Sequence, residues 1–163
     1  MTRKSILSAA TALTILTASC GGNKDNKETA DNQKQEPVAN VDVRGQWYLE
    51  NIVFSDSENV RPSEEVPGVR QYIVFEDSTY FIHTNCNTFS GLYTVIGDSI
   101  TLGDGAMTEM ACDNMATEDA LRKIMPNIAT VCIQNDSIAR LASRNPSEYI
   151  VLRKAPIEIK RKN

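Results

Sequence analysis

Apolar and polar residues alternate with a period of two through much of residues 46–153, which is the pattern of β-strands with one buried face. The first run covers 46–53 and places Trp47, Leu49 and Val53 on one face. The later runs are rich in β-branched and aromatic residues, and they cover 71–76, 79–83, 92–96, 100–102, 129–133, 138–141 and 149–153. Residues 55–69, with many Ser, Asp, Glu and Pro, predict a long loop after the first strand.

The dipeptide Asp-Ser divides neighbouring runs three times, at 77–78, 98–99 and 136–137. The pairs at 97–98 (Gly-Asp) and 135–136 (Asn-Asp) tolerate positive φ better than most sequences. Each of the three connections therefore predicts a hairpin, and together they predict an antiparallel meander.

Residues 114–128 break this two-residue rhythm and predict one helix. The apolar residues that share a helical face there are Met115, Leu121, Ile124, Met125 and Ile128. Asn114 or Thr117 can cap the start, and Pro126 should end or kink the helix because it lacks a backbone donor. The fold class that follows is α+β, with about seven or eight short strands in a small antiparallel barrel-like meander and one helix that closes an end or covers a gap.

The N-terminal part predicts export and lipidation. Residues 1–19 combine an early basic pair with an apolar run at 6–17, which is shorter than the about 20 residues that a membrane-spanning helix needs. Residues 16–20 (LTASC) resemble a bacterial lipobox, whose cysteine is acylated and becomes the mature N-terminus. We therefore expect a lipoprotein signal peptide at 1–19 and acyl chains on Cys20. An ordinary secreted protein cut near Ala18 is the alternative.

Composition divides the rest of the chain. Residues 20–43 hold the lipidated cysteine and a polar tether, 44–155 form the folded domain, and 156–163 form a basic tail. Loss of the signal removes two of the 17 basic residues and leaves 15 against 21 acidic ones, a formal charge of −6. Nucleic acid is therefore not an expected partner, since phosphate binding needs clustered Lys and Arg.

Three cysteines remain in the mature chain beyond Cys20. An exported protein lies in an oxidising space, so we expect two of them to pair. A bond between Cys86 and Cys112 would close a loop for which chain entropy predicts roughly 3–4 kcal/mol of stabilisation. The alternative is that both are small buried thiols. Cys132, opposite its apolar neighbours, is then the odd thiol: exposed, packed under a loop, or the true partner of one of the others.

No catalytic or metal-binding set emerges. A nucleophile made of Cys86 and the one histidine, His83, has no Asn or Asp that can be assigned to orient it. A zinc site of His83, Cys86 and Cys112 has no fourth ligand and no familiar spacing. The carboxylates are scattered, and the sequence has no glycine-rich phosphate loop. We expect no enzyme activity, no metal and no cofactor.

The polar residues around Cys86 have two interpretations. Turn-forming residues in this position predict a tight bend that leads into the next strand. The same stretch could instead form a rim at an open barrel end that holds a peptide or glycan. The candidate rim residues are Asn85, Asn87, Ser90 and Tyr93.

Three ordered motifs give a resemblance to a known family. Residues 45–49 (GQWYL), 85–93 (NCNTFSGLY) and 108–112 (TEMAC) resemble the META domain (HslJ-like) family, and the similarity covers 43–154. The sequence departs from the family at Asn85, where Gly is common, and at Arg140, where alternation favours an apolar residue and a bulge is therefore expected. The resemblance implies a small β-rich barrel, often lipidated or secreted and associated with envelope stress, heat shock or drug tolerance. It implies no established activity, substrate or cofactor.

These observations predict a non-enzymatic envelope lipoprotein, held to a membrane, expected to be the outer membrane, through acyl chains on Cys20. Its role would be stress-associated binding or structure, with a protein or small-ligand partner. One alternative is an inhibitor of an exogenous hydrolase such as lysozyme, because residues 90–93 (SGLY) are similar to the short Ser/Gly/Tyr motif of one inhibitor family. Another is an apolar-ligand carrier, since 72–75 and 80–82 have apolar residues on both faces.

Overall fold

The computed structural model describes residues 39–156. The predictions for the signal peptide, for lipidation at Cys20, for most of the tether and for nearly all of the basic tail lie outside these residues. Within 39–156, neither α1 nor the short turn after it is long and apolar enough to cross a membrane.

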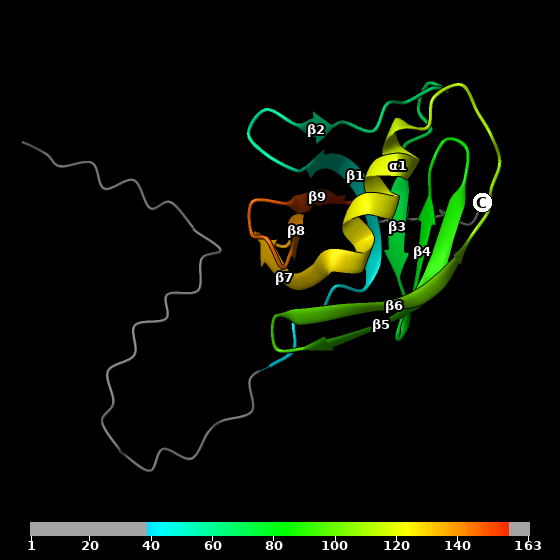
Figure 1. Cartoon of the computed structure of the whole chain (residues 1–163). Helices are drawn as coiled ribbons and strands as arrows, with labels where there is room; N and C mark the ends of the chain where they lie inside the picture. The colour runs from blue at the N-terminus through cyan, green and yellow to red at the C-terminus, as the bar shows by residue number, and fades with distance from the viewer. Residues whose placement is uncertain (1–38, 157–163) are drawn as a thin grey trace, which may run out of the picture. The chain divides into compact units, whose positions relative to one another are not determined.

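Eight antiparallel strands close into a barrel, as the order of their pairing shows: β1, β3, β4, β5, β6, β7, β8 and β9, with β9 paired back to β1. The strands are β1 (Gly45–Val53), β3 (Tyr72–Phe75), β4 (Thr79–His83), β5 (Thr88–Ile96), β6 (Ser99–Met107), β7 (Ile128–Gln134), β8 (Ile138–Ser143) and β9 (Tyr149–Lys154) (Figure 1). A short strand, β2 (Asn59–Val60), adds to β1. One helix, α1 (Ala116–Ile124), continues into a single 3-10 turn, η1 (Met125–Asn127). The predicted α+β barrel with one helix is confirmed.

The three predicted hairpins are β3–β4, β5–β6 and β7–β8. Two of their turns use the positive φ that their residues tolerate: Gly97 has φ 64°, while Asn135 and Asp136 have φ 51° and 55°. Two consecutive positive φ values are the geometry of a type I′ turn, whose twist matches that of the flanking strands. Turn chemistry therefore sets the register of these strand pairs.

A bulge in β1 changes which residues face the core. Leu49 lies opposite Leu152 and Asn51 opposite Val151, so Glu50 is an extra residue in the ladder. The inward alternation consequently passes from Leu49 to Ile52, which has no exposed surface. The extra residue places its carboxylate outside the barrel, 2.6 Å from the Arg70 guanidinium and 2.9 Å from Nε of Arg153. Burial alone would raise the pKa of Glu50, but the hydrogen bonds from these two arginines outweigh it and leave that pKa below its usual value.

The bulge expected at Arg140 is wrong. Arg140 pairs regularly with Cys132 on one side and Val151 on the other, and the neighbouring residues of β8 keep the same register. Its side chain points outward, where the guanidinium lies 3.7 Å from the Tyr149 ring centroid and donates a hydrogen bond to the carbonyl of Pro146. A polar side chain on the outer face breaks the apolar pattern without disturbing the pairing.

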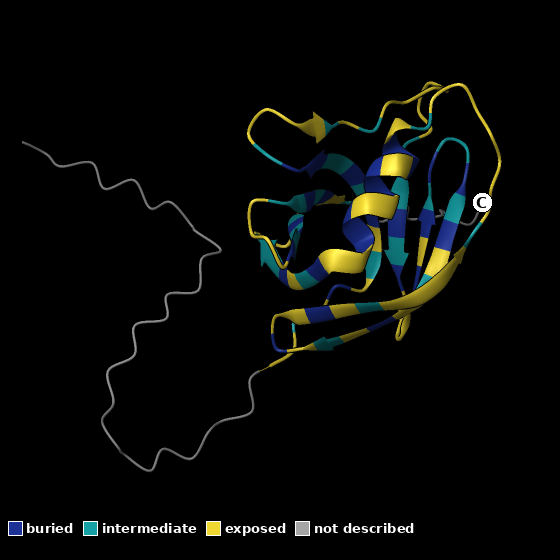
Figure 2. Cartoon of the chain, in the orientation of Figure 1, coloured by how far each residue is buried: buried dark blue, intermediate teal, exposed yellow. Residues whose placement is uncertain are grey.

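Helix α1 lies across one end of the barrel, with β7 to β9 on one side of it, β3 and β4 on the other, and the β5–β6 hairpin passing below it (Figure 1). Leu121 and Ile124 have no exposed surface and belong to the barrel core, while the opposite side of the helix faces solvent (Figure 2). As predicted, the helix ends just before Pro126, which lies in η1. At the other end, the side-chain oxygen of Asn114 accepts a hydrogen bond from the backbone N–H of Ala116.

Trp47 lies at the centre of the core, with 1% of its surface exposed. Its indole N–H donates to the carbonyl of Val43 at 2.7 Å, so the one polar atom of this large side chain is satisfied. The ammonium of Lys154 lies 4.2 Å from the centroid of the ring. The segment before β1 and the end of β9 thus both contact the same side chain.

We predict that Leu121→Ala lowers the free energy of unfolding by about 2–5 kcal/mol, because it leaves a cavity where the helix meets the barrel. Urea denaturation measures the change. Leu92→Ala is the matched control, since Leu92 is 62% exposed on the outer face of β5 and its loss should change stability by no more than about 0.5 kcal/mol. Equal losses in the two variants would contradict the role assigned to α1.

Candidate functional site

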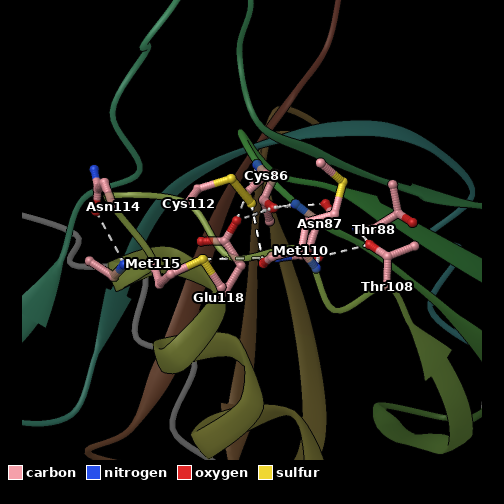
Figure 3. Close-up of a disulfide and its surroundings, with 11 residues drawn as sticks. Cys86, Asn87, Thr88, Thr108, Met110, Cys112, Asn114, Met115 and Glu118 are labelled. Atoms are coloured by element: carbon pink, nitrogen blue, oxygen red, sulfur yellow. Dashed lines mark hydrogen bonds between the residues drawn. A yellow bond between two sulfur atoms is a disulfide. The ribbon is translucent and has the colours of Figure 1, made fainter.

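Cys86 and Cys112 form a disulfide, with 6.2 Å between their Cα atoms, as predicted (Figure 3). Cys86 lies in the turn between β4 and β5, and Cys112 lies between β6 and α1. The bond therefore links the start of the β5–β6 hairpin to the segment that follows it. Closure of a loop of this size is worth about 3.5 kcal/mol in the chain-entropy model.

Asn87 is the centre of a hydrogen-bond network beside the disulfide. Only 1% of its surface is exposed. Its side-chain oxygen accepts from the hydroxyl of Thr108 at 2.9 Å and from the N–H of Met110 at 2.8 Å, and its amide donates to the carbonyl of Met110 at 3.0 Å (Figure 3). One buried side chain thus makes both hydrogen bonds that a neighbouring β-strand would make with Met110. The Cys-Asn and Thr-Glu-Met-Ala-Cys motifs meet through this amide.

Glu118, in the first turn of α1, joins the same network. Its carboxylate accepts hydrogen bonds from the hydroxyl of Thr84 and from the backbone N–H of Cys86, the latter at 3.3 Å. Only 1% of this residue is exposed, so the two donors and the positive end of the helix dipole replace the water that the carboxylate loses. The helix start is therefore fixed to the turn that carries the disulfide.

Cys132, on β7, is half-buried, and no cysteine among residues 39–156 is a free thiol. The sequence left open whether Cys132 is exposed, packed under a loop or bonded to another cysteine, and a free, exposed thiol is the alternative that this excludes. His83 stacks beside Tyr72 with 5.4 Å between ring centroids. Within the described part of the chain, no three His, Cys, Asp or Glu side chains are placed to hold a metal ion.

The four candidate rim residues do not lie together. Asn85 donates to the carbonyl of Ser63, Asn87 is buried in the network, and Ser90 faces solvent on the outer side of β5. Tyr93 points into the barrel, and its hydroxyl donates to the carbonyl of Glu76. Burial raises the pKa of Tyr93, which keeps this hydroxyl protonated as a donor. The bend predicted from the same residues accounts for their placement.

The backbone conformation at Asn85 does not require the glycine that is common at this position in the family. Among residues 39–156, the non-glycine residues with positive φ are Asn135 and Asp136, so Asn85 has an ordinary backbone conformation. The departure from the family pattern therefore causes no backbone strain at this position.

The barrel wall opens between β6 and β7. The two strands share one residue pair, Ser99 with Thr130, and the N–H of Val131 donates to the carbonyl of Asp98 at 2.8 Å. Beyond this point β6 continues to Met107 and passes below the C-terminal part of α1 (Figure 1). Residues 103–106 of β6 are exposed, as Figure 2 shows.

A groove of about 500 Å³ lies between this part of β6 and α1, and we call it the β6–α1 groove. Its apolar residues are Tyr80, Phe89, Leu102, Met107, Leu121 and Met125. Asp104, Glu109 and Arg122 supply its charges, and the Arg122 Nε lies 3.2 Å from the sulfur of Met107. Burial raises the pKa of Tyr80, so its hydroxyl stays neutral in the groove. An apolar floor with a polar rim is typical of binding surfaces.

Glycines let β5, β6 and Tyr80 approach closely beneath the groove. A Cβ added to Gly91 would lie 2.8 Å from the Tyr80 hydroxyl, and one added to Gly105 would lie 2.1 Å from the carbonyl oxygen of Ser90. The apolar pattern predicts that this strand ends at 102, whereas β6 continues to Met107 and forms one side of the groove. The signal was the Gly-Asp-Gly run at 103–105, because a glycine inside a strand pattern often marks a close backbone approach.

We predict that Asn87→Ala lowers the free energy of unfolding by about 2–4 kcal/mol, because it removes three part-buried hydrogen bonds of the Asn87 side chain, two with Met110 and one with Thr108. Thermal or urea unfolding measures this change in the free energy of unfolding. The matched control is Asn85→Ala, which removes a single hydrogen bond from the Asn85 side-chain amide to the carbonyl of Ser63 near the surface. This loss should cost about 1 kcal/mol or less. If Asn87→Ala were as mild as its control, the network would not hold the two motifs together.

Comparisons with known proteins give the family and a shared fold. A family model described as META domain matches residues 39–156. Among curated proteins, none matches the sequence. A protein from Burkholderia xenovorans, solved by NMR, is 14% identical with a TM-score of 0.56, over 77% of this chain and 99% of that one. A DUF4847 family protein from Bacteroides vulgatus is 12% identical with a TM-score of 0.49, over 68% and 92%. The first likeness shows a shared fold, and the family match shows that the chain belongs to the META domain family.

Proposed function

We propose that this protein is a lipid-anchored, non-enzymatic envelope lipoprotein whose barrel binds a partner through the β6–α1 groove. The observation that carries the binding role is the groove itself, which has a volume of about 500 Å³ and an apolar floor. The polar groups of the family motifs support this division, because Asn87 accepts a hydrogen bond from Thr108 and Glu118 accepts one from Thr84, which ties these segments to one another. The partner would then bind to the β6–α1 groove, and the family motifs would hold the strands and the helix that form the groove in position.

Anchoring rests on the sequence. The basic start, the short apolar run and the lipobox-like residues 16–20 support acylation of Cys20, and the polar residues that follow would separate the barrel from the membrane surface. A stress-associated role comes from the family resemblance and belongs to the same proposal.

The lysozyme-inhibitor alternative receives no support from the geometry of its motif. Ser90 faces outward from the middle of β5, while Tyr93 is buried and bonded to the carbonyl of Glu76. Two residues on opposite faces of a strand do not form a single projecting element that could enter an enzyme active site.

Carriage of an apolar ligand has one observation in its favour, which is the volume of the β6–α1 groove. Carriers bury most of the surface of their ligand. The groove has exposed residues along β6 on one side, and the barrel interior is occupied by large side chains such as Trp47, Phe75 and Ile82. An open groove of this kind fits a peptide or protein segment better than a small apolar molecule.

Lipid anchoring predicts that the protein takes up an alkyne-labelled fatty acid in its host cells. Cys20→Ala should remove the label completely, whereas Cys132→Ala should retain it. Gel fluorescence after coupling to a dye measures both. Retention of the label by Cys20→Ala would contradict acylation at this residue.

The binding role is tested with a photoreactive amino acid placed at Asp104, in the groove, or at Asp56, an exposed residue outside it. We expect illumination of host cells to give a discrete crosslinked product from position 104 and none from position 56. Identical patterns from both positions, or no product from either, would contradict a groove-centred function.

A further inference from the structure

We propose that the β6–α1 groove binds an extended, cationic peptide segment, which adds to the free edge of β6 as a further strand. This inference rests on the proposed function and specifies the chemistry of the partner. It combines an unpaired strand edge, a floor that accepts side chains and a charge imbalance around the groove.

The edge of β6 that faces β7 is available over most of its length. Among residues 39–156, β6 and β7 share only the pair of Ser99 with Thr130. In the two-residue hairpin at 97–98, Ile96 and Ser99 lie opposite each other and bond to one another, so Ser99 and Thr101 bond to β5 while Ile100 and Leu102 direct their backbone N–H and C=O away from it. The register shifts after Leu102, and the N–H of Thr108 then donates to the carbonyl of Thr88, so Gly105 and Met107 are the next residues whose backbone groups face the groove. Such an edge is a template for another strand.

The shape of the groove suits a backbone. Gly103, Gly105 and Ala106 carry little or no side chain, so an incoming chain can approach β6 closely. Side chains of a bound strand alternate between two faces, and those on one face would lie on Phe89, Leu121 and neighbouring apolar residues. The six residues 102–107 match a segment of about 20 Å.

Charge favours a cationic segment. Residues 71–121, from β3 to the middle of α1, contain eight acidic residues and no Lys or Arg. Asp104 and Glu109 of this stretch are exposed at the groove, where Arg122 is the one opposing charge among the lining residues. A second copy of the chain paired edge to edge along β6 would bring its own acidic residues close to Asp104 and Glu109, which like charges disfavour. A partner with Lys or Arg at alternate positions meets the opposite charge.

The test uses the full chain in a zwitterionic detergent and a blocked heptapeptide of alternating Lys and Val. We expect the peptide to bind by calorimetry and to slow amide hydrogen exchange in residues 100–107. A heptapeptide of alternating Glu and Val should not bind. The Lys-Val peptide methylated on the backbone nitrogens of one edge should lose binding, because that edge can no longer donate hydrogen bonds to β6.

Asp104→Lys should weaken binding about five- to tenfold, while Asp56→Lys, an equal change of charge outside the groove, should leave it unchanged. Raising the salt concentration should also weaken binding to the original chain. Equal binding of the Glu-Val or the methylated peptide, or protection outside 100–107, would overturn the proposal.

The protein's own tail, with Lys160, Arg161 and Lys162, is the competing occupant. Replacing these three residues by Ala should leave amide exchange in 100–107 unchanged without peptide. Faster exchange there would assign the edge to the tail and overturn the proposal. A crosslink at Asp104 together with no binding of the Lys-Val peptide would reject the cationic partner and keep the groove as a binding surface.

Discussion

The buried amide of Asn87 is the interaction on which the rest of the structure depends. It satisfies both backbone groups of Met110, and so it ties the segment after β6 to the turn before β5 without a strand between them. The disulfide fixes the same two segments covalently, and Glu118 fixes the start of α1 to the turn. The position of the helix across the barrel end follows from these three connections. An amide can do this because it offers a donor and an acceptor side by side.

Local chemistry made much of the barrel predictable. The turn at Asn135 and Asp136 needs positive φ, and these residue types tolerate it, so this dipeptide was enough to predict the hairpin. The end of α1 was equally evident from Pro126. The bulge at Glu50 was not, because a single extra residue is set by the partner strand and leaves no mark in the alternation of β1 alone. Arg140 misled for the opposite reason, since an outward polar residue resembles a break in the pattern.

The candidate site was harder to predict than the fold. The sequence left Asn87 either in a tight bend or on a solvent-facing rim, and its buried hydrogen bonds could not be foreseen because they depend on Met110 and Thr108, which lie more than 20 residues away. The β6–α1 groove depends on where pairing between β6 and β7 stops, and the local trace of that point in the sequence is the Gly-Asp-Gly run at 103–105. The motifs that identify the family and the surface proposed to bind a partner are thus different parts of the structure around the β5–β6 hairpin, and β6 connects them.

The position of Trp47 has a practical consequence. It is the one tryptophan of the chain, it is enclosed by the barrel core, and it is not among the residues that line the β6–α1 groove. Its intrinsic fluorescence therefore reports the integrity of the whole barrel through a single chromophore. Since occupancy of the groove does not change its immediate surroundings, one optical signal can separate variants that have lost their fold from variants that have lost only recognition.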